Sequence, residues 1–508
     1  MQEVAVKRVA KNTVIMFIRM FVLMIISFLT SRWLLKQLGV EDYGIYSVVG
    51  SVTSTFVALK SLFSESIQRF LNFHKGKNNL KAQKEVFSIS IIVHLILAIL
   101  FVIILEVVGI WLINNKLVFP PEKYDTVIFV FQMTVISSVF SILCIPFDAL
   151  IIANERMGFF ALISILDGIF RLAVVIALPF IHYESLRAYS LLLIFIPVFS
   201  LVVSTLYSKR FPEFSFSVKF DSGLLKEIVS LSGWNFFGNI SFSLLHEGIN
   251  FTLNIFGGLV YNASRSIAYQ VKNIAIQFSN NSLIAVRPMV MQSAADERGS
   301  SVLFNNIIEI SRLSFFIMLI PIVPIEAFCT ELLKIWLVEV PESAVLFTRL
   351  ILVSVLIRSL HEPLNMLYMS MGKIKRMMII EVVVMLLSLA VIYVLLSSGA
   401  PLWVSFALLA AMEAIIVLSL IINSKKELGF PVSSYLRKVV IPMLLLLLTN
   451  SVIAYLFALI NTNSIILLLL LCCFLVLIVG VSIYFFLDKR ELTLIQRIVQ
   501  SKFQKQTE

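Results

Sequence analysis

The feature that most constrains this chain is a succession of long apolar segments. A helix needs about 20 mostly apolar residues to cross the hydrocarbon core of a bilayer, and the 508-residue sequence holds many such runs. Hydrophobic residues make up 59% of it and charged residues 14%, whereas soluble proteins average about 45–50% and about 25%. The composition excludes a soluble enzyme, a disordered chain and a disulfide-stapled secreted domain. It predicts an all-α polytopic membrane protein with fourteen spans, at residues 12–36, 44–70, 86–112, 126–150, 159–180, 188–206, 229–255, 259–286, 305–328, 345–370, 377–397, 402–422, 440–459 and 463–487.

Cysteine usage and the N-terminal segment indicate neither a metal site nor a cleaved signal. The first apolar run, from Asn12 to Gln37, is too long for the apolar core of a signal peptide and reads as a retained span. The cysteines form no CxxC motif and no cluster with histidine. We therefore expect no metal, no cofactor and no disulfide framework. The four cysteines, all within or at the end of apolar runs, are Cys144, Cys329, Cys472 and Cys473.

The basic residues predict the orientation of the chain. Lys and Arg number 41 against 30 Asp and Glu, a formal net charge of +11. In a soluble protein this excess would suggest nucleic acid, but in a membrane protein Lys and Arg accumulate in cytoplasmic loops. With a cytoplasmic N-terminus, alternate connections hold most of the basic residues. We therefore expect both termini in the cytoplasm, contact with bilayer lipid and no nucleic-acid partner. The opposite connections hold only Lys36, Lys116, Lys123, Arg187 and Lys334.

Three short motifs recur in the same order, which suggests an internal repeat. Spans 1–6 and 7–12 would be two copies of one unit with the same orientation, an arrangement typical of transporters. The motif pairs are 39–43 with 257–261, 110–113 with 335–338, and 146–150 with 363–367. The last pair places Pro146 and Pro363 inside spans, where proline is expected to kink a helix. The predicted parts are an N-lobe at 1–208, a cytoplasmic linker at 209–228, a C-lobe at 229–424, and helices 13 and 14 with a cytoplasmic tail at 425–508.

Polar side chains follow one face of the first two spans in each predicted copy. Polar groups within a span are costly and usually face a bundle interior or a water-filled cavity, so these stripes predict a central cleft. Cations in such a cleft suit an anionic head group. We expect four to contact it: Arg19, Lys60, Arg265 and Lys272. The predicted polar lining is Asn12, Ser61, Glu65, Asn235, Asn239, His246, Glu247, Asn250, Tyr269, Asn273 and Gln277.

Structural alternatives exist for many of these polar groups. Asn and Ser on neighbouring spans often hydrogen-bond simply to hold helices together, and Glu247 is able to neutralise a cleft cation. Asp167 and Arg171 are four residues apart and are expected to form an ion pair within one helix. His361 is interpreted as an isolated packing residue. Glu381 and Glu413 lie in distal spans, and a role in proton coupling is an alternative for them.

Several motifs resemble bacterial polysaccharide (O-antigen) flippases. The opening LLKQLGVEDYGIYSVVGSV carries the Leu-Gly pair and the Asp-Tyr-Gly-x-Tyr of that family at Leu38, Gly39, Asp42–Gly44 and Tyr46. The segments 231–240 and 253–281 are similar to the seventh and eighth helices of its lipopolysaccharide-biosynthesis members, and 335–338 and 371–382 fit as well. The resemblance covers essentially the whole chain. It implies the fold of the multidrug/oligosaccharidyl-lipid/polysaccharide exporter superfamily.

The resemblance also implies an activity. A flippase of this family moves an undecaprenyl-diphosphate-linked oligosaccharide from the cytoplasmic to the periplasmic leaflet of the bacterial inner membrane, by alternating access of two lobes. Polysaccharide polymerase machinery would be a partner. The family's arginine-lined cleft matches the four cations only loosely, since positions 60 and 272 are lysines.

Three other activities remain open at this point. A multidrug/cation antiporter of the same fold would favour acidic residues in the cleft. The charge of the cleft residues does not distinguish a lipid II flippase from a flippase for a lipid-linked oligosaccharide. A membrane polysaccharide polymerase or ligase would need a large external loop and a catalytic constellation, which the sequence lacks, so the chain is expected not to be an enzyme. The coupling ion, whether sodium, proton or none beside the membrane potential, is left open.

Overall fold

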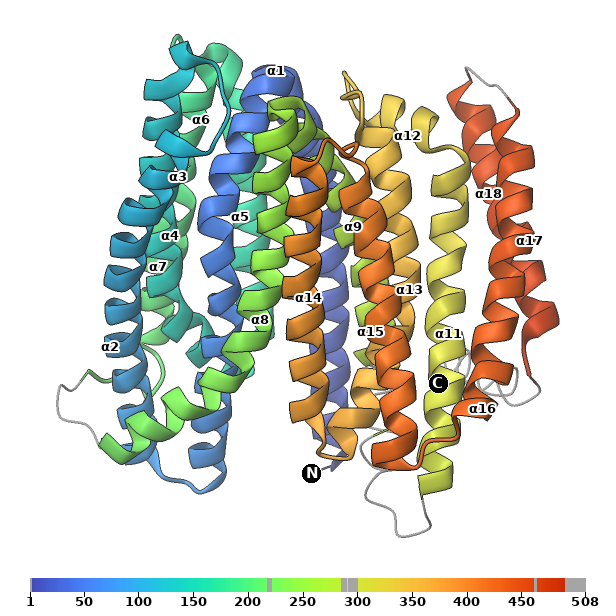
Figure 1. Ribbon diagram of the computed structural model, residues 1–508. Helices are drawn as coiled ribbons and strands as arrows, with labels where there is room; N and C mark the ends of the chain where they lie inside the picture. The colour runs from blue at the N-terminus through green and yellow to red at the C-terminus, as the bar shows by residue number, and fades with distance from the viewer. Residues whose placement is uncertain (1, 217–221, 285–289, 291–299, 461–463, 489–508) are drawn as a thin grey trace. The chain divides into compact units, whose positions relative to one another are not determined.

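A computed structural model of the chain describes all residues except 1, 217–221, 285–289, 291–299, 461–463 and 489–508. For residues 2–14, 17, 52–66, 76, 222, 224–240, 278–284, 300 and 374 it describes the helical backbone alone. The described part is helical throughout, apart from short connections (Figure 1). The all-α prediction is therefore confirmed.

The helices of the first half run from Gln2 to Gly257. The long ones have few breaks because their interiors are Leu, Ile, Val, Phe and Ala, and lipid offers the backbone no other hydrogen-bond partner. Their bounds are α1 Gln2–Gly76, α2 Leu80–Ile104, η1 Leu105–Gly109, α3 Ile110–Asn115, η2 Pro121–Lys123, α4 Tyr124–Ala153, α5 Met157–Ala177, η3 Leu178–Phe180, α6 Ser185–Leu193, α7 Phe195–Ser208 and α8 Ser222–Gly257.

The helices of the second half follow after Gly258. Among all described helical segments, eleven are long and apolar enough to cross a membrane. The predicted count of fourteen crossings remains a prediction. The bounds are α9 Leu259–Ile284, α11 Ser300–Ala327, α12 Cys329–Trp336, α13 Ala344–Ser370, α14 Ile374–Ser397, α15 Val404–Leu428, α16 Val432–Tyr435, η4 Leu436–Val440, α17 Ile441–Ala458 and α18 Ile465–Phe486.

The LGVEDYG motif forms the junction between the first two predicted spans. Gly39 has φ 72° and ψ 177°, so α1 is two helices joined at this residue, and a positive φ is where glycine is favoured over other residues. A Cβ on Gly44 would lie 2.3 Å from the backbone oxygen of Leu259, so only glycine lets the start of α9 approach α1 this closely. Asp42 pairs with Lys123 at 3.1 Å, and Tyr43 is buried. The motif therefore has a packing role at each of these positions.

Pro146 and Pro363 both lie inside continuous helices, α4 and α13. A proline has no N–H to donate to the carbonyl four residues earlier, which here belongs to Ile142 and Ser359. The predicted kinks are compatible with these positions and remain predictions.

The chain divides into two compact units. Unit 1 comprises residues 1–266, 336–342 and 385–402, and unit 2 comprises 267–335, 343–384 and 403–508. In unit 1, α1 packs against α4, α5 and α8. In unit 2, α13 packs between α11 and α15, and α11 also contacts α17 and α18. The boundaries of the units differ from the predicted linker at 209–228, and the six-helix repeat remains a prediction.

Candidate functional site

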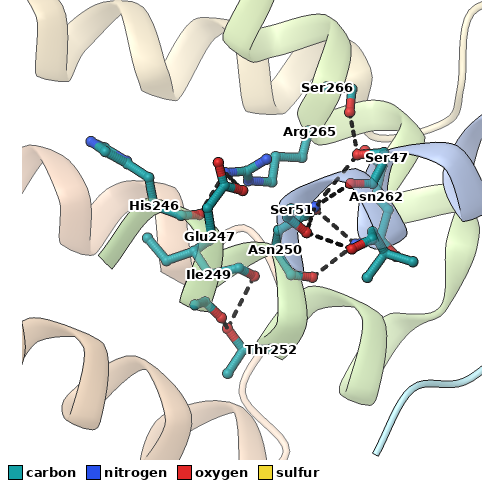
Figure 2. Close-up of polar contacts among 12 residues, drawn as sticks. Ser47, Ser51, His246, Glu247, Ile249, Asn250, Thr252, Asn262, Arg265 and Ser266 are labelled. Carbon is teal, nitrogen blue, oxygen red and sulfur yellow. Dashed lines mark hydrogen bonds and ion pairs between the residues drawn. The ribbon is translucent and has the colours of Figure 1, made fainter. Parts of the chain in front are cut away.

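A network of amide and hydroxyl groups joins α1, α8 and the start of α9 within unit 1 (Figure 2). Asn250 donates from Nδ2 to Ser51 Oγ at 2.9 Å and to the Ser47 carbonyl at 3.2 Å. Its Oδ1 accepts from Asn262 Nδ2 at 2.8 Å. Ser47 and Ser266 share a further hydrogen bond between their hydroxyls. This part of the predicted polar stripe is therefore satisfied by contacts between helices.

Asn254 extends the same network to the connection after α3. Its Oδ1 accepts from the backbone N–H of Val118 at 2.7 Å, and its Nδ2 donates to the Val118 carbonyl at 3.1 Å and to Asn262 Oδ1 at 3.0 Å. Asn250, Asn254 and Asn262 are each 0% exposed. Buried amides that are fully paired specify one packing arrangement. These three residues accordingly hold the helices in one packing arrangement.

Arg265 is the predicted cation nearest this network. It is 5% exposed, donates to the backbone carbonyl of His246 and lies 3.5 Å from Glu247 Oε2. Figure 2 shows the Arg265 and Glu247 side chains directed toward one another. The structure thus brings Arg265 and Glu247 together, and the guanidinium charge is compensated by the carboxylate.

Lys272 lies two helical turns further along α9 than Arg265, within unit 2. It is 6% exposed, and its ammonium group lies 4.6 Å from the ring centroid of Tyr269, a cation–π contact. Asn273 and Gln277 are exposed. The side chains of six predicted residues lie outside the described part: Asn12, Lys60, Ser61, Glu65, Asn235 and Asn239.

Arg19 lines a polar cavity of about 820 Å³ in unit 1. The cavity is lined by α1, α4, α5, α6 and α7, which supply serines and a threonine, three further charged residues and the rings of Tyr46 and Phe160. The Arg19 guanidinium lies 4.9 Å from the Phe160 ring centroid and donates weakly to Met16 Sδ at 3.5 Å. Its Nε is buried without a hydrogen-bond partner.

Arg171, Asp148 and Asp167 also line this cavity. Arg171 donates to Tyr46 Oη at 3.5 Å, and Asp167 accepts from Ser200 Oγ at 2.5 Å. The predicted Asp167–Arg171 ion pair is wrong: no such pair forms between these two described residues, because Arg171 reaches Tyr46 on α1 and Asp167 reaches Ser200 on α7.

The two cavity arginines share an unusual property. Within the described residues, neither Arg19 nor Arg171 has a carboxylate within ion-pair distance. The cavity hydroxyls are oriented by their own helices: Thr134, Ser141 and Ser164 each donate to the carbonyl four residues earlier. Their oxygens remain able to accept. The cavity therefore combines guanidinium donors with hydroxyl acceptors.

Unit 2 contains a different buried group of charges. Arg358 Nη1 lies 2.9 Å from Glu413 Oε1, and Arg358 Nη2 lies 3.9 Å from Glu362 Oε1. His361 Nε2 lies 2.7 Å from Glu381 Oε1. The prediction that His361 is isolated is wrong, because its partner lies on another helix, and spacing along one helix gives no sign of it.

Unit 2 also has an apolar cavity of about 500 Å³ between α11, α13 and α17, in which Glu326 and Arg349 are the charged lining residues. Among the residues that the structure describes, no group of three or more His, Cys, Asp and Glu is placed to hold a metal ion.

Comparison with solved structures identifies the fold. The chain is similar to the lipid II flippase MurJ in an inward closed conformation, with a TM-score of 0.68, 13% identity, and coverage of 94% of this chain and 99% of that one. It is similar to an inward-facing multidrug resistance MATE family transporter of the MOP superfamily, with a TM-score of 0.69, 12% identity, and coverage of 82% and 96%.

A third structure is a MOP superfamily transporter from Pyrococcus furiosus, described as having a binding pocket of reverse polarity. Its TM-score is 0.63 at 14% identity, covering 84% of this chain and 96% of that one. No family model and no curated protein matches the sequence. The chain therefore has the fold of MOP superfamily transporters. The descriptions of these matched structures name a flippase and transporters. That this chain is not an enzyme remains a prediction.

Proposed function

We propose that the chain is a flippase for an undecaprenyl-diphosphate-linked oligosaccharide, acting in the bacterial inner membrane in the synthesis of surface polysaccharide such as O-antigen. The observation that carries the proposal is the pair of arginines, Arg19 and Arg171, that line the polar cavity of unit 1 and have no carboxylate partner among the residues that the structure describes. The MOP transporter fold supports a transport activity.

An uncompensated guanidinium in a chain of this composition favours an anionic ligand. Ionisable residues within membrane segments are costly and mark substrate pathways. A guanidinium presents planar paired donors that match phosphate oxygens. The other arginines at the described sites, Arg265 and Arg358, are already paired with glutamates. Arg19 and Arg171 are therefore the donors available for a diphosphate.

The remaining lining fits a sugar. Sugar hydroxyls both donate and accept, so they need acceptors as well as donors around them. Asp148, Asp167 and the serine and threonine oxygens supply acceptors, and the ring of Tyr46 supplies an apolar face. The volume of about 820 Å³ lies within the usual range of about 300–1,000 Å³ for ligand sites. An oligosaccharide head group accordingly suits this cavity in both size and chemistry.

The other predicted cations retain a place in the proposal. Arg265, Lys272 and Lys60 are proposed to lie along the substrate path, with Arg265 exchanging its partner Glu247 for phosphate when substrate is present. The predicted lining residues are likewise proposed to lie along the substrate path. Asn250 in addition makes hydrogen bonds between helices.

Alternating access would carry the head group while the lipid tail stays in the bilayer. The membrane potential supplies about 2.3 kcal/mol per charge per 100 mV, and an inside-negative potential favours outward movement of an anion. Both termini and the basic connections would face the cytoplasm, as the distribution of Lys and Arg predicts.

A lipid II flippase is the nearest alternative, because the MurJ structure covers almost the whole of both chains. A multidrug antiporter would instead bind cations. The deciding experiment deletes the gene and identifies the lipid-linked intermediate that accumulates. We expect a lipid-linked oligosaccharide that is not lipid II, and its disappearance on complementation. Accumulation of lipid II, or sensitivity to cationic drugs without any accumulated intermediate, would contradict the proposal.

A further inference from the structure

The apolar cavity of unit 2 has a charged end, which lies where two helices end and begin. Glu326 is the last residue but one of α11, and Arg349 lies in the second turn of α13. The short helix α12 joins these two helix ends (Figure 1). Both α11 and α13 are long and apolar enough to cross a membrane. The charged end of the cavity is therefore at the level of the lipid head groups.

The cavity is about as deep as one leaflet of a bilayer. Its lining on α11 runs from Glu326 back to Phe315, and its lining on α13 runs from Arg349 to Leu360, eleven positions in each case. At a rise of 1.5 Å per residue, both runs span about 16 Å. Half of a hydrocarbon core of about 30 Å is about 15 Å. A chain that enters at the charged end thus reaches the middle of the bilayer at the other.

The interior of the cavity suits a hydrocarbon chain. Beyond the charged end, α11 and α13 line it with Leu, Ile, Val, Phe and Ala alone. On α17 the polar lining residues are Asn450, Ser451 and Tyr455. The Asn450 amide already donates to the Leu446 carbonyl at 2.8 Å and to Ser482 Oγ at 3.2 Å. The volume of about 500 Å³ is in the usual range of about 300–1,000 Å³ for a ligand site.

The two charged groups at the end of the cavity do not neutralise one another. In the part of the chain that the structure describes, Glu326 and Arg349 form no ion pair with each other, and Glu326 Oε1 is buried without a hydrogen-bond partner. Arg349 is exposed, and its guanidinium contacts the Cys329 thiol. A buried acceptor without a donor costs free energy. The site therefore calls for a ligand with an N–H donor for the acid and an anion for the arginine.

We propose that this cavity binds one phospholipid with an ethanolamine head group. The lipid phosphate meets the Arg349 guanidinium, whose planar donors match phosphate oxygens. The ammonium group donates to Glu326 Oε1, since an ammonium has N–H donors and no acceptor. One acyl chain fills the apolar interior, which joins α17 to α11 and α13 through the lipid. This site is independent of the proposed transport substrate.

Other membrane lipids lack one of these matches. A choline head group carries the same charges but has no N–H to donate to Glu326. A glycerol head group has a phosphate and no cation. An undecaprenyl diphosphate brings two phosphates and no cation, and its extended chain is much longer than one leaflet is deep. The acid and the base together therefore select a zwitterion with an N–H donor.

Lipid titration of the purified full chain, followed by native mass spectrometry, measures this selectivity. The probes are phosphatidylethanolamine, phosphatidylcholine and phosphatidylglycerol with identical acyl chains. We expect the first to bind at least about 10-fold more tightly than the other two, the usual worth of a charged hydrogen bond. Equal binding of the three, or no binding of any, would overturn the proposal. Tighter binding of undecaprenyl diphosphate would also overturn it, by assigning the cavity to the tail of a polyprenyl lipid.

Two variants locate the selectivity in the cavity. Glu326→Gln keeps the shape of the side chain and removes its charge, so it should lower the affinity for phosphatidylethanolamine to that for phosphatidylcholine. Arg349→Gln should weaken the binding of all three lipids. Glu342→Gln is the matched control, because Glu342 is exposed in the connection before α13 and does not line the cavity. A preference for ethanolamine that survives in Glu326→Gln would overturn the assigned contact.

Thermal unfolding in detergent gives a second measurement on the same proteins. A ligand that binds the folded chain raises its melting temperature. Phosphatidylethanolamine should raise the melting temperature of the wild type more than phosphatidylcholine does, and the two lipids should have equal effects on Glu326→Gln. Ala454→Phe, which places a ring in the cavity lining, should remove the response to both lipids. Equal effects of the two lipids on the wild type would contradict the proposal.

Discussion

The polar cavity of unit 1 and the charged group of unit 2 use the same residue types in opposite ways. In the cavity, Arg19 and Arg171 have no carboxylate partner within the described part of the chain, while Asp148 and Asp167 accept from serine or cysteine. In unit 2, Arg358 contacts two glutamates directly. An arginine left without an acid is available to a ligand, whereas one held by acids stabilises the fold. Pairing, more than the presence of charge, therefore distinguishes a binding group from a structural one.

The largest effect on stability is expected from Arg358→Ala. It leaves Glu413, which is 5% exposed, without its cation, and breaking one side of a buried pair costs about 3–5 kcal/mol. Thermal unfolding of the full chain in detergent measures the loss. The double variant Arg358→Met with Glu413→Leu should recover most of it, because neither charge is then left alone. A single variant as stable as wild type would show that the pair is not structural.

A smaller loss is expected for Arg265→Ala, about 1.5–3 kcal/mol, the usual worth of a hydrogen bond to a charged group. This variant leaves Glu247 without the guanidinium 3.5 Å away. The comparison with Arg265→Leu/Glu247→Leu separates two roles. If Arg265 also meets the substrate, the double variant regains stability but not transport. Recovery of both would restrict Arg265 to the fold.

Gly44→Ala tests close helix packing instead of charge. The new Cβ would lie 2.3 Å from the backbone oxygen of Leu259, so the helices must separate, at about 1–3 kcal/mol. Gly50→Ala, in the same helix and with no atom within 4 Å of its Cβ, is the control and should be neutral or slightly stabilising. Equal melting temperatures for the two variants would contradict the assigned contact.

The smallest effect is expected at Lys123, which pairs with Asp42 at 3.1 Å and Glu184 at 3.5 Å. These groups are partly exposed, so Lys123→Ala should cost about 0.2–1 kcal/mol and lose that effect in high salt. Unfolding measured at low and high salt checks this. A loss as large as that of Arg358→Ala would erase the distinction between exposed and buried pairs.

Much of the fold follows from composition and apolar runs alone. Every predicted span coincides with helical backbone in the described residues, because lipid leaves the backbone no alternative. The junction at Gly39 did not follow from composition. Residues 37–43 separate the two predicted spans, whereas in the structure Gly39 alone, with a positive φ, interrupts the helix. A glycine in an otherwise helical sequence does not reveal its φ.

The site was less predictable for a physical reason. Helical spacing places residues on a face but does not say which helix that face meets. It placed Arg265 and Glu247 on polar stripes of neighbouring spans without saying which cation Glu247 meets, and the structure brings the two together across α8 and α9. It paired Asp167 with Arg171 within one helix, although each has a partner on another helix. His361 looked isolated because Glu381 lies on α14.

Transport by Arg19→Ala tests the central claim most directly. Purified wild-type chain in proteoliposomes should move undecaprenyl diphosphate bearing N-acetylglucosamine, and Arg19→Ala should be about 10- to 100-fold slower, as expected for loss of a charged hydrogen bond. Its melting temperature should be unchanged, since no carboxylate loses a partner, and Arg19→Lys should recover part of the rate. Wild-type rates in Arg19→Ala, or movement of a cationic dye in place of the anionic lipid, would contradict the account.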